Sequence, residues 1–287
     1  MKKILICGAS SFVAHGFAEA LNQEGYDVEL FSRGSSPVRT GNQIRGKYLE
    51  IDKNECLAES YYAVVNFAVL KNASAEDNVK YLEALCRLCE RTGISKLIHF
   101  SSIMVYDANL KRIDERSPIA SSKTTDMKGY GVLKIATDEY LDSVKASVPF
   151  QLIRVRPGFV LAEGVACPFI KNLPGGFKVI LGKKKSTLPI VWREDIHKAL
   201  IKLLEEDVNI DICHLCPDNG MTKYQYAKDT VGGRILTLPK FLFKDMPHAM
   251  AAIKLMPNSL AVRFERMFID SHYSSELSEK TLGFKFK

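Results

Sequence analysis

Short apolar runs alternate with amphipathic stretches over the first half of the chain. Runs of Val, Ile, Leu and Phe predict buried strands over residues 2–8, 26–32, 63–68, 97–101 and 150–154. Between them, apolar positions recur at helical spacing, which predicts helices over residues 13–25, 76–92 and 130–146. Apolar strands that alternate with helices are typical of a parallel sheet covered on both faces. We therefore predict a doubly wound α/β fold.

The pattern changes near residue 160. Prolines and glycines follow in close succession between residues 168 and 189, and irregular apolar segments come after them. We expect residues 1–160 to form the main domain and residues 161–287 to form mainly a smaller lobe. A predicted helix over 193–206 and a predicted strand over 211–215 favour the return of residues 188–217 to the main sheet. Such sheets bind ligands beyond the carboxyl ends of their strands, so the residues that follow each strand are the functional candidates.

The composition excludes several classes of protein. Forty basic and 33 acidic side chains give a net charge of +7, which favours an anionic partner. The basic residues form no dense stripe with aromatic residues between them, so we expect no nucleic-acid partner. No apolar segment approaches the roughly 20 residues of a membrane-spanning helix, and the apolar run after Met1 is too short for a signal peptide. Seven cysteines, an odd number, indicate reduced thiols, and we expect a cytoplasmic protein.

Two CxxC pairs, Cys86/Cys89 and Cys213/Cys216, have the spacing of zinc ligands. The first pair belongs to the apolar stripe of a predicted helix, where cysteine packs as a small hydrophobic residue. The second pair alternates like a strand, and more than 120 residues separate the pairs. We therefore expect no metal site.

The residues after the first predicted strand suit a bound dinucleotide. They read GASSFVA from Gly8 to Ala14. A dinucleotide fold needs a tight turn, close approach of the backbone, and amide groups of a helix N-terminus aimed at the pyrophosphate. Small residues meet most of this need. Because Ser11 and Ala14 stand where glycines are preferred, the segment by itself also fits an ordinary strand-to-helix turn.

The end of the second predicted strand carries Ser32 and Arg33 where an acidic residue would bind the adenosine ribose of NAD. A carboxylate there would repel a 2′-phosphate, whereas Arg33, with Arg39 as a second candidate, can pair with one. This arrangement favours NADPH over NAD. The alternative is an arginine in a surface loop.

A serine, a tyrosine and a lysine form the candidate catalytic set. Ser102 follows the strand predicted over 97–101, and Tyr130 and Lys134 share one face of the next predicted helix. A phenol with a pKa of about 10 is a poor acid or base near neutrality, but a nearby ammonium group would lower that pKa. Ser102 would polarise a carbonyl oxygen. A tyrosine and a lysine four residues apart are common by chance, so this spacing alone does not identify a catalytic pair. The order of the three residues along the chain and the elements around them strengthen the assignment.

Several segments together resemble the extended short-chain dehydrogenase/reductase superfamily and its NAD-dependent epimerase/dehydratase family. The resemblance covers essentially the whole chain and is carried by GASSFVA, VVNFA, NVKYLEALCRLCERTGISKLIHFSSIMVY, YGVLK, IRVRPGFV, VWREDIHKAL and FIDSHYSSELSEKTLGFKF. Its most specific part is the combination of SSIMVY with YGVLK. The chain departs from the family pattern at Ser11 and Ala14, and at AEG, where many members read YGP after the RPG segment.

The resemblance implies a Rossmann-type doubly wound sheet with a small C-terminal substrate-binding lobe. It implies Tyr130 as the catalytic acid or base, Lys134 as the group that binds the nicotinamide ribose and tunes Tyr130, and Ser102 as a contact of the reacting oxygen. The implied cofactor-binding residues are Gly8, Ser10, Ser11, Phe12, Val13, Arg33, Phe67, Ala68, Tyr130, Lys134 and Pro157. The implied substrate-binding residues are Ser102, Tyr130, Asn172, Arg263 and Arg266, with Arg266 the first candidate to clamp the substrate diphosphate through bidentate pairing.

The choice of reaction within the family depends on few residues. Ile103 and Met104 stand where 4,6-dehydratases carry an acidic pair, so a dehydratase is not expected. Reduction of a 4-keto sugar by NADPH and 4-epimerisation with a retained NAD both remain open. Arg33 and the similarity of the tail to nucleotide-sugar 4-ketoreductases of bacterial polysaccharide pathways favour reduction of a UDP-linked 4-keto-6-deoxy sugar. Non-catalytic dinucleotide binding is a third possibility, which the complete set of Ser102, Tyr130 and Lys134 disfavours.

The family often forms homodimers through two helices that correspond to residues 76–92 and 130–146. The resemblance therefore implies a homodimer in which Cys86 and Cys89 lie partly in the interface. The amphipathic stretch over residues 236–268 would fit either a membrane surface or a folded lobe. Its acidic residues and its prolines favour the lobe.

Overall fold

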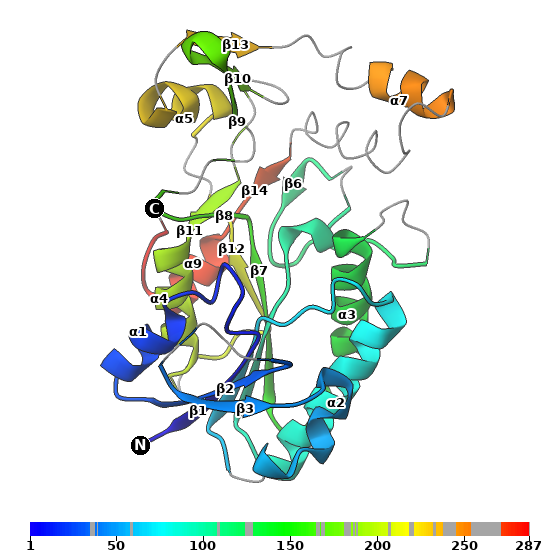
Figure 1. Ribbon diagram of the computed structural model, residues 1–287, viewed down its shortest axis with the longest axis vertical. Coiled ribbons are helices and arrows are strands. Elements are labelled where there is room, and N and C mark those ends of the chain that lie inside the picture. The colour runs from blue at the N-terminus through cyan, green and yellow to red at the C-terminus, as the bar shows by residue number, and fades with distance from the viewer. Residues whose placement is uncertain are drawn as a thin grey trace.

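A parallel seven-stranded sheet forms the centre of the molecule, with the strand order β12-β7-β5-β4-β1-β2-β3 (Figure 1). The structure is a computed structural model and describes residues 1–34, 38, 40–57, 60–107, 110–123, 129–164, 167, 170–180, 185, 187, 189–205, 208–217, 221–231, 234–237, 245–253 and 271–286. The strands of this sheet are β1 (Lys3–Cys7), β2 (Asp27–Ser32), β3 (Asn42–Arg45), β4 (Ala63–Asn66), β5 (Lys96–Phe100), β7 (Gln151–Pro157) and β12 (Ile212–Leu215). The predicted Rossmann-type fold is confirmed.

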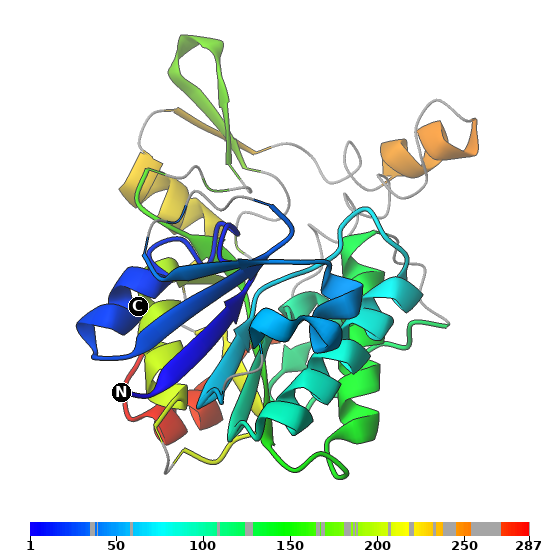
Figure 2. The same cartoon turned by 60° about the horizontal axis from the view of Figure 1, so that its bottom comes forward.

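Helices cover both faces of the sheet (Figure 2). One face packs against α1 (Phe17–Gln23), α4 (Arg193–Leu203) and α9 (Glu276–Leu282), and the other against α2 (Ala75–Thr92) and α3 (Tyr130–Val144). Because side chains alternate along a strand, Ile4 and Ile6 enter the first core whereas Leu5 and Cys7 enter the second. Both sets are buried, which explains why the strands are apolar throughout.

Local signals set the ends of the long helices. The Ser74 side chain accepts from the backbone N–H of Asp77, the Asp77 carboxylate accepts from that of Ser74, and Gly93 ends α2 with a left-handed φ of 62°. At the end of α4, the buried Lys96 ammonium donates to the carbonyl oxygens of Leu203 and Glu205. This lysine satisfies carbonyl groups that a helix terminus leaves without partners.

The structure departs from the prediction at several elements. α1 begins at Phe17 rather than near residue 13, because Gly16 adopts a left-handed φ of 83° and residues before it form turns. β7 continues three residues beyond 154, to Pro157. β3 was not predicted, because it is a short edge strand in which only Ile44 is buried.

A smaller lobe lies beyond the carboxyl ends of the main sheet (Figure 1). Its three-stranded sheet has the order β13-β10-β9, and its elements are β9 (Ile170–Leu173), β10 (Phe177–Ile180), β13 (Arg234–Thr237), α5 (Lys223–Tyr226) and α7 (Asp245–Ala252). Two two-stranded sheets lie near the junction of this lobe with the main sheet. One pairs β8 (Phe159–Leu161) with β11 (Ile190–Trp192), and the other pairs β6 (Arg112–Ile113) with β14 (His272–Tyr273). Within residues 188–217, β12 pairs with β7 and α4 (Arg193–Leu203) packs against the main sheet.

Both cysteines of the first CxxC pair are packed in the hydrophobic core between the sheet and α2. Cys86 and Cys89 are buried on α2, and burial raises the pKa of the Cys86 thiol to about 12. Cys86 also forms a hydrogen bond with Tyr140 of α3. Each cysteine has almost no surface exposed on the single chain, and the homodimer with its interface stays a prediction.

The described part of the chain offers neither a metal site nor a membrane-spanning helix. It contains no group of His, Cys, Asp and Glu side chains that could hold a metal ion. None of its helices combines the length and the apolar character needed to cross a membrane.

Candidate active site

A cleft of about 860 Å³ opens at the carboxyl ends of β1, β2, β4 and β5. Its walls are formed by the loops that follow these strands and by the first residues of α3. Of the predicted cofactor-binding residues, those that line it are Gly8, Ser10, Ser11, Phe12, Val13, Arg33, Phe67, Ala68, Tyr130 and Lys134. Sequence reasoning missed Tyr48, Val69, Lys71, Asn72 and Leu133, which also line the cleft.

The loop after β1 requires glycine at its first position. Gly8 has a φ of 81°, and a Cβ there would lie 2.7 Å from the backbone nitrogen of Ala68. The cradle between the β1 and β4 loops is therefore open only because residue 8 has no side chain. Ser11 replaces a glycine but supports the turn, since its hydroxyl accepts from the backbone N–H of Ala14 at 3.3 Å.

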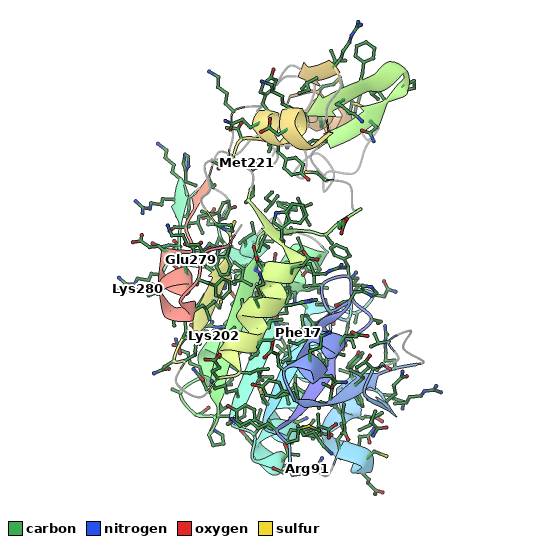
Figure 3. All side chains as sticks on the ribbon, turned by 90° about the vertical axis from the view of Figure 1, so that its left-hand side faces the viewer. Phe17, Arg91, Lys202, Met221, Glu279 and Lys280 are labelled. Atoms are coloured by element: carbon green, nitrogen blue, oxygen red, sulfur yellow. The ribbon has the colours of Figure 1, made fainter. Side chains whose placement is uncertain are left out.

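The helix N-terminus expected behind this loop is not formed there. Turns continue up to Gly16, and α1 starts only at Phe17. Phe17 packs instead against His197 of α4, with ring centroids 5.3 Å apart, and is labelled in Figure 3. His197 in turn shares a hydrogen bond of 2.9 Å between its Nε2 and the carbonyl oxygen of Val13. The loop is thus held from behind by α4 as well as by its own turns.

The charged side chains that line the cleft in the described part of the chain are all basic. They are Arg33 after β2, Lys71 after β4, and Lys134 on α3. The Arg33 guanidinium lies over the ring of Tyr48, 5.9 Å from its centroid. Arg39, the second candidate, lies outside the described residues. A cleft with three cations and a glycine cradle fits a dinucleotide with several phosphates.

A smaller pocket of about 210 Å³ adjoins the cleft. It is lined by Val13, residues 100–104, Tyr130 and residues 157–160, so it includes Ser102 and the predicted contact Pro157. Val13, Phe100 and Tyr130 line both spaces. The structure therefore places Tyr130 between a cofactor-sized cleft and a pocket that contains Ser102.

The side chains of Tyr130 and Lys134 share one face of α3, as their spacing predicts. Tyr130 is the first residue of the helix and follows Gly129, whose φ is 67°. The Lys134 ammonium lies 5.7 Å from the centroid of the Tyr130 ring and donates to the carbonyl oxygen of Phe100. Lys134 is 2% exposed, whereas Tyr130 is 39% exposed and can be reached from the pocket.

Burial shifts the pKa values of both groups. Although part of Tyr130 is exposed, the surrounding protein desolvates it enough to raise its pKa to about 12, and Asp138 adds to this rise. Burial lowers the pKa of Lys134 to about 8, against the opposing effect of Asp138. The expectation that Lys134 lowers the pKa of Tyr130 is therefore wrong for this structure. Tyr130 is protonated at neutral pH and is suited to donate a proton.

Ser102 follows β5 by two residues and caps the short 3-10 turn Ile103–Val105. Its hydroxyl accepts from the backbone N–H of Met104 at 3.2 Å, which fixes the serine at the edge of the small pocket. The next two pocket residues are Ile103 and Met104, and no carboxylate lines this pocket among the residues described. Beside Ser102, the buried hydroxyl of Ser101 has no hydrogen-bond partner within the described residues.

Of the predicted substrate-binding residues of the lobe, Asn172 lies among the described residues, and the structure does not bring it to this site. Asn172 lies on β9, is exposed, and accepts from the Lys178 ammonium of β10 at 2.7 Å. It lines neither the cleft nor the small pocket. Arg263 and Arg266 lie outside the described residues.

Comparisons with known proteins agree with this geometry. The sequence model of the NAD dependent epimerase/dehydratase family matches residues 4–213. No curated protein matches the chain significantly. Among solved structures, a short-chain dehydrogenase/reductase superfamily protein from Agrobacterium tumefaciens with bound NAD is 15% identical, with 99% of this chain and 92% of that chain covered and a TM-score of 0.71.

Two further solved structures are similar over nearly the whole chain. A UDP-glucose 4-epimerase from Thermotoga maritima with UDP-glucose is 16% identical, covering 99% of this chain and 94% of that one with a TM-score of 0.71. TunA, an NAD dependent NDP-hexosamine 5,6-dehydratase of tunicamycin biosynthesis, is also 16% identical, covering 99% and 92% with a TM-score of 0.69. At these identities the likeness concerns the fold.

Proposed function

Because this chain belongs to the NAD dependent epimerase/dehydratase family, we propose that it reduces the 4-keto group of a nucleotide-linked 4-keto-6-deoxy sugar with NADPH. UDP is the proposed nucleotide, and polysaccharide biosynthesis is the proposed setting. The observation that carries the proposal is the position of Tyr130, which lines both the cationic cleft and the pocket that contains Ser102. A proton donor that lines both the cleft and the pocket is suited to a reaction between a cofactor in the cleft and a substrate in the pocket.

Each of the three side chains has a defined task in this proposal. The Ser102 hydroxyl donates a hydrogen bond to the sugar carbonyl oxygen and polarises the carbonyl group. A bound reduced nicotinamide supplies the hydride that converts the carbonyl carbon to a carbinol. Tyr130, protonated at neutral pH, gives its proton to the same oxygen and regains one from solvent. Lys134 holds a positive charge beside Tyr130 and binds ribose hydroxyls.

The choice of NADPH rests on the charges of the cleft. Arg33 follows β2 and Lys71 follows β4, the two strands that flank β1. No acidic side chain lines the cleft in the described part of the chain. A carboxylate at the end of β2 would bind the ribose hydroxyl of NAD and repel a 2′-phosphate, whereas a guanidinium pairs with that phosphate.

Two other functions share parts of this site. A 4-epimerase with retained NAD needs the same Ser102, Tyr130 and Lys134, and the similarity to a UDP-glucose 4-epimerase supports it as the second candidate. Arg33 favours the reductase, because NADPH is a freely exchanging reductant. The absence of a carboxylate beside Ser102 among the described residues disfavours dehydration.

The proposal is tested by mixing the protein with NADPH and a panel of UDP- and dTDP-linked 4-keto-6-deoxy sugars while the absorbance of the reduced nicotinamide is followed. We expect oxidation of NADPH with at least one sugar. The Tyr130→Phe variant should lose about 10²- to 10⁴-fold in turnover and still bind NADPH. Tyr62→Phe is the control, since the Tyr62 hydroxyl donates to the Leu204 carbonyl at 2.8 Å and lies away from the cleft.

Failure with every sugar, together with interconversion of UDP-sugar epimers without added cofactor, would replace the reductase by the epimerase. Near-normal turnover of Tyr130→Phe would remove the catalytic role of Tyr130.

A further inference from the structure

One buried guanidinium joins the separate elements that carry the candidate catalytic side chains. Arg156 lies on β7, immediately before Pro157 of the small pocket, and is 1% exposed. Its Nε and Nη2 atoms lie 2.9 and 2.8 Å from Oδ2 of Asp138 on α3. Its Nη1 atom donates to the Tyr106 hydroxyl at 3.0 Å. All three guanidinium nitrogens therefore contact either Asp138 of α3 or Tyr106 in the loop after β5.

The contact with Tyr106 fixes the position of the Ser102 loop. Ser102 opens the 3-10 turn Ile103–Val105, and Tyr106 closes it, with its N–H donating to the Ile103 carbonyl at 3.3 Å. The Arg156 guanidinium also lies 5.0 Å from the centroid of the Tyr106 ring. The same ring forms a T-shaped contact with His214 of β12, with 5.5 Å between the ring centroids. The turn that carries Ser102 is thus anchored at its far end through Tyr106, which both Arg156 and His214 contact.

The contact with Asp138 fixes the position and the charge of the Tyr130–Lys134 face. Asp138 lies one helical turn after Lys134 and two turns after Tyr130, and all of its surface is buried. Both bonds from Arg156 go to Oδ2, and Oδ1 has no hydrogen-bond partner within the described residues. A carboxylate paired with a buried guanidinium places negative charge beside the buried face of α3.

Few other ionisable groups act on Lys134. From β5, His99 faces it, and burial together with the charges of Lys134 and Arg154 holds the pKa of His99 well below its usual value, so this imidazole is neutral. From its own helix, Tyr130 is protonated, and the carboxylate of Asp138 lies one turn away and pairs with Arg156. Asp138 raises the pKa of Lys134 against the larger effect of burial. Without Asp138, burial would lower the pKa of Lys134 further, so its side chain would be a neutral amine over more of the physiological pH range.

We propose that Arg156 and Asp138 are positioning residues of the reaction: Arg156 holds the Ser102 turn in register with α3, and Asp138 places a buried carboxylate one helical turn from Lys134 on the face that carries Tyr130. This inference rests on the proposed function, because it assigns the pair a task in the same site. It predicts two separable effects. Loss of the Asp138 carboxylate should change the charge of Lys134, and loss of the Tyr106 hydroxyl should change the alignment of Ser102 with Tyr130.

The first test measures the charge of Lys134 without any substrate. Protein with ¹³C-labelled lysine side chains is titrated by NMR, and the Lys134 signal is assigned with Lys134→Arg. We expect the pKa of Lys134, about 8 in the parent protein, to fall by about one unit in Asp138→Asn. Asp142→Asn is the matched control, since Asp142 lies on the same helix and pairs with Arg154 at 3.1 Å. It should leave the pKa of Lys134 unchanged.

The second test uses turnover. If the proposed reaction is found, the alkaline limb of its pH profile should move downward in Asp138→Asn and stay in place in Asp142→Asn, because loss of the carboxylate lowers the pKa of both Lys134 and Tyr130. A purely structural role would reduce turnover equally at every pH. Tyr106→Phe, which removes only the hydroxyl that Arg156 contacts, should lower kcat about tenfold with unchanged affinity for NADPH.

These measurements separate the inference from the function on which it rests. An unchanged pKa of Lys134 in Asp138→Asn overturns the electrostatic role even if the protein is an active reductase. Normal kcat in Tyr106→Phe overturns the alignment role. A shifted pKa in a protein that reduces none of the sugars supports the role of Asp138 and rejects the proposed reaction. If Asp138→Asn does not fold, Tyr106→Phe decides the alignment role and Asp138→Glu, which keeps the charge, should retain a pKa near that of the parent.

Discussion

Replacement of Arg33 by alanine tests the assignment of the cofactor. Arg33 follows β2 at the edge of the cleft, and the ring of Tyr48 supports its guanidinium at 5.9 Å. Hydrogen bonds to a charged group contribute about 1.5–3 kcal/mol each. Because Arg33 is exposed and solvent screens its charge, the lower end of that range applies. We therefore expect the Kd for NADPH to rise about tenfold in Arg33→Ala.

The assay is fluorescence titration of NADPH and NADH against the parent protein and two variants. NADH affinity should change little in Arg33→Ala, because NADH carries no 2′-phosphate. The difference between the two cofactors should shrink as salt is added. Arg91→Ala is the control, since Arg91 lies at the opposite end of the molecule from the smaller lobe (Figure 3) and donates to the Leu57 carbonyl. Equal losses for NADPH and NADH, or no loss for either, would refute the assignment of Arg33 to the 2′-phosphate.

Three further predictions concern single side chains of the site. Gly8→Ala should destabilise the protein by about 2–4 kcal/mol in urea unfolding and abolish NADPH binding, because its Cβ meets the Ala68 backbone at 2.7 Å and its φ is left-handed. Ser102→Ala should lower kcat about 10²-fold in steady-state assays and leave the Kd for NADPH unchanged. Lys134→Met should be inactive yet more stable at pH 7 by about 1–3 kcal/mol, because the folded protein holds the pKa of this lysine at about 8 and so disfavours its ammonium form. The parent protein should correspondingly gain stability as the pH rises from about 8 to 10.5, a gain that urea unfolding of Lys134→Met should not show.

The sequence predicts the main sheet because its strands are buried on both faces. A residue such as Val64 is apolar whichever face it meets, so the strand appears as a continuous run. α2 was predicted nearly to the residue, since a capping box begins it and Gly93 ends it. α1 was predicted too early, because the left-handed conformation of Gly16 is set by tertiary packing and leaves no signal that distinguishes it from a helical glycine.

The candidate site was predictable where it follows strand ends and not where it depends on long-range pairing. Ser102, Tyr130 and Arg33 stand at strand or helix ends, so topology alone brings them to one edge of the sheet. The sign of the pKa shift of Tyr130 was not predictable, because it depends on how much of the phenol the folded chain desolvates. The link between Arg156 and Asp138 joins residues 18 positions apart through the interior, and the sequence pattern does not indicate it.

The central claim is the transfer of one hydride from NADPH to a sugar carbonyl with Tyr130 as the proton donor. It is tested most directly by reaction of the active sugar with NADPH that carries deuterium at nicotinamide C4, followed by mass spectrometry of the sugar product. The account predicts one deuterium in each product molecule, one NADPH consumed for each, and labelled product from Tyr130→Phe at a rate about 10²- to 10⁴-fold below that of the parent. Conversion of the sugar without consumption of NADPH and without label, or labelled product from Tyr130→Phe at the parent rate, would contradict it.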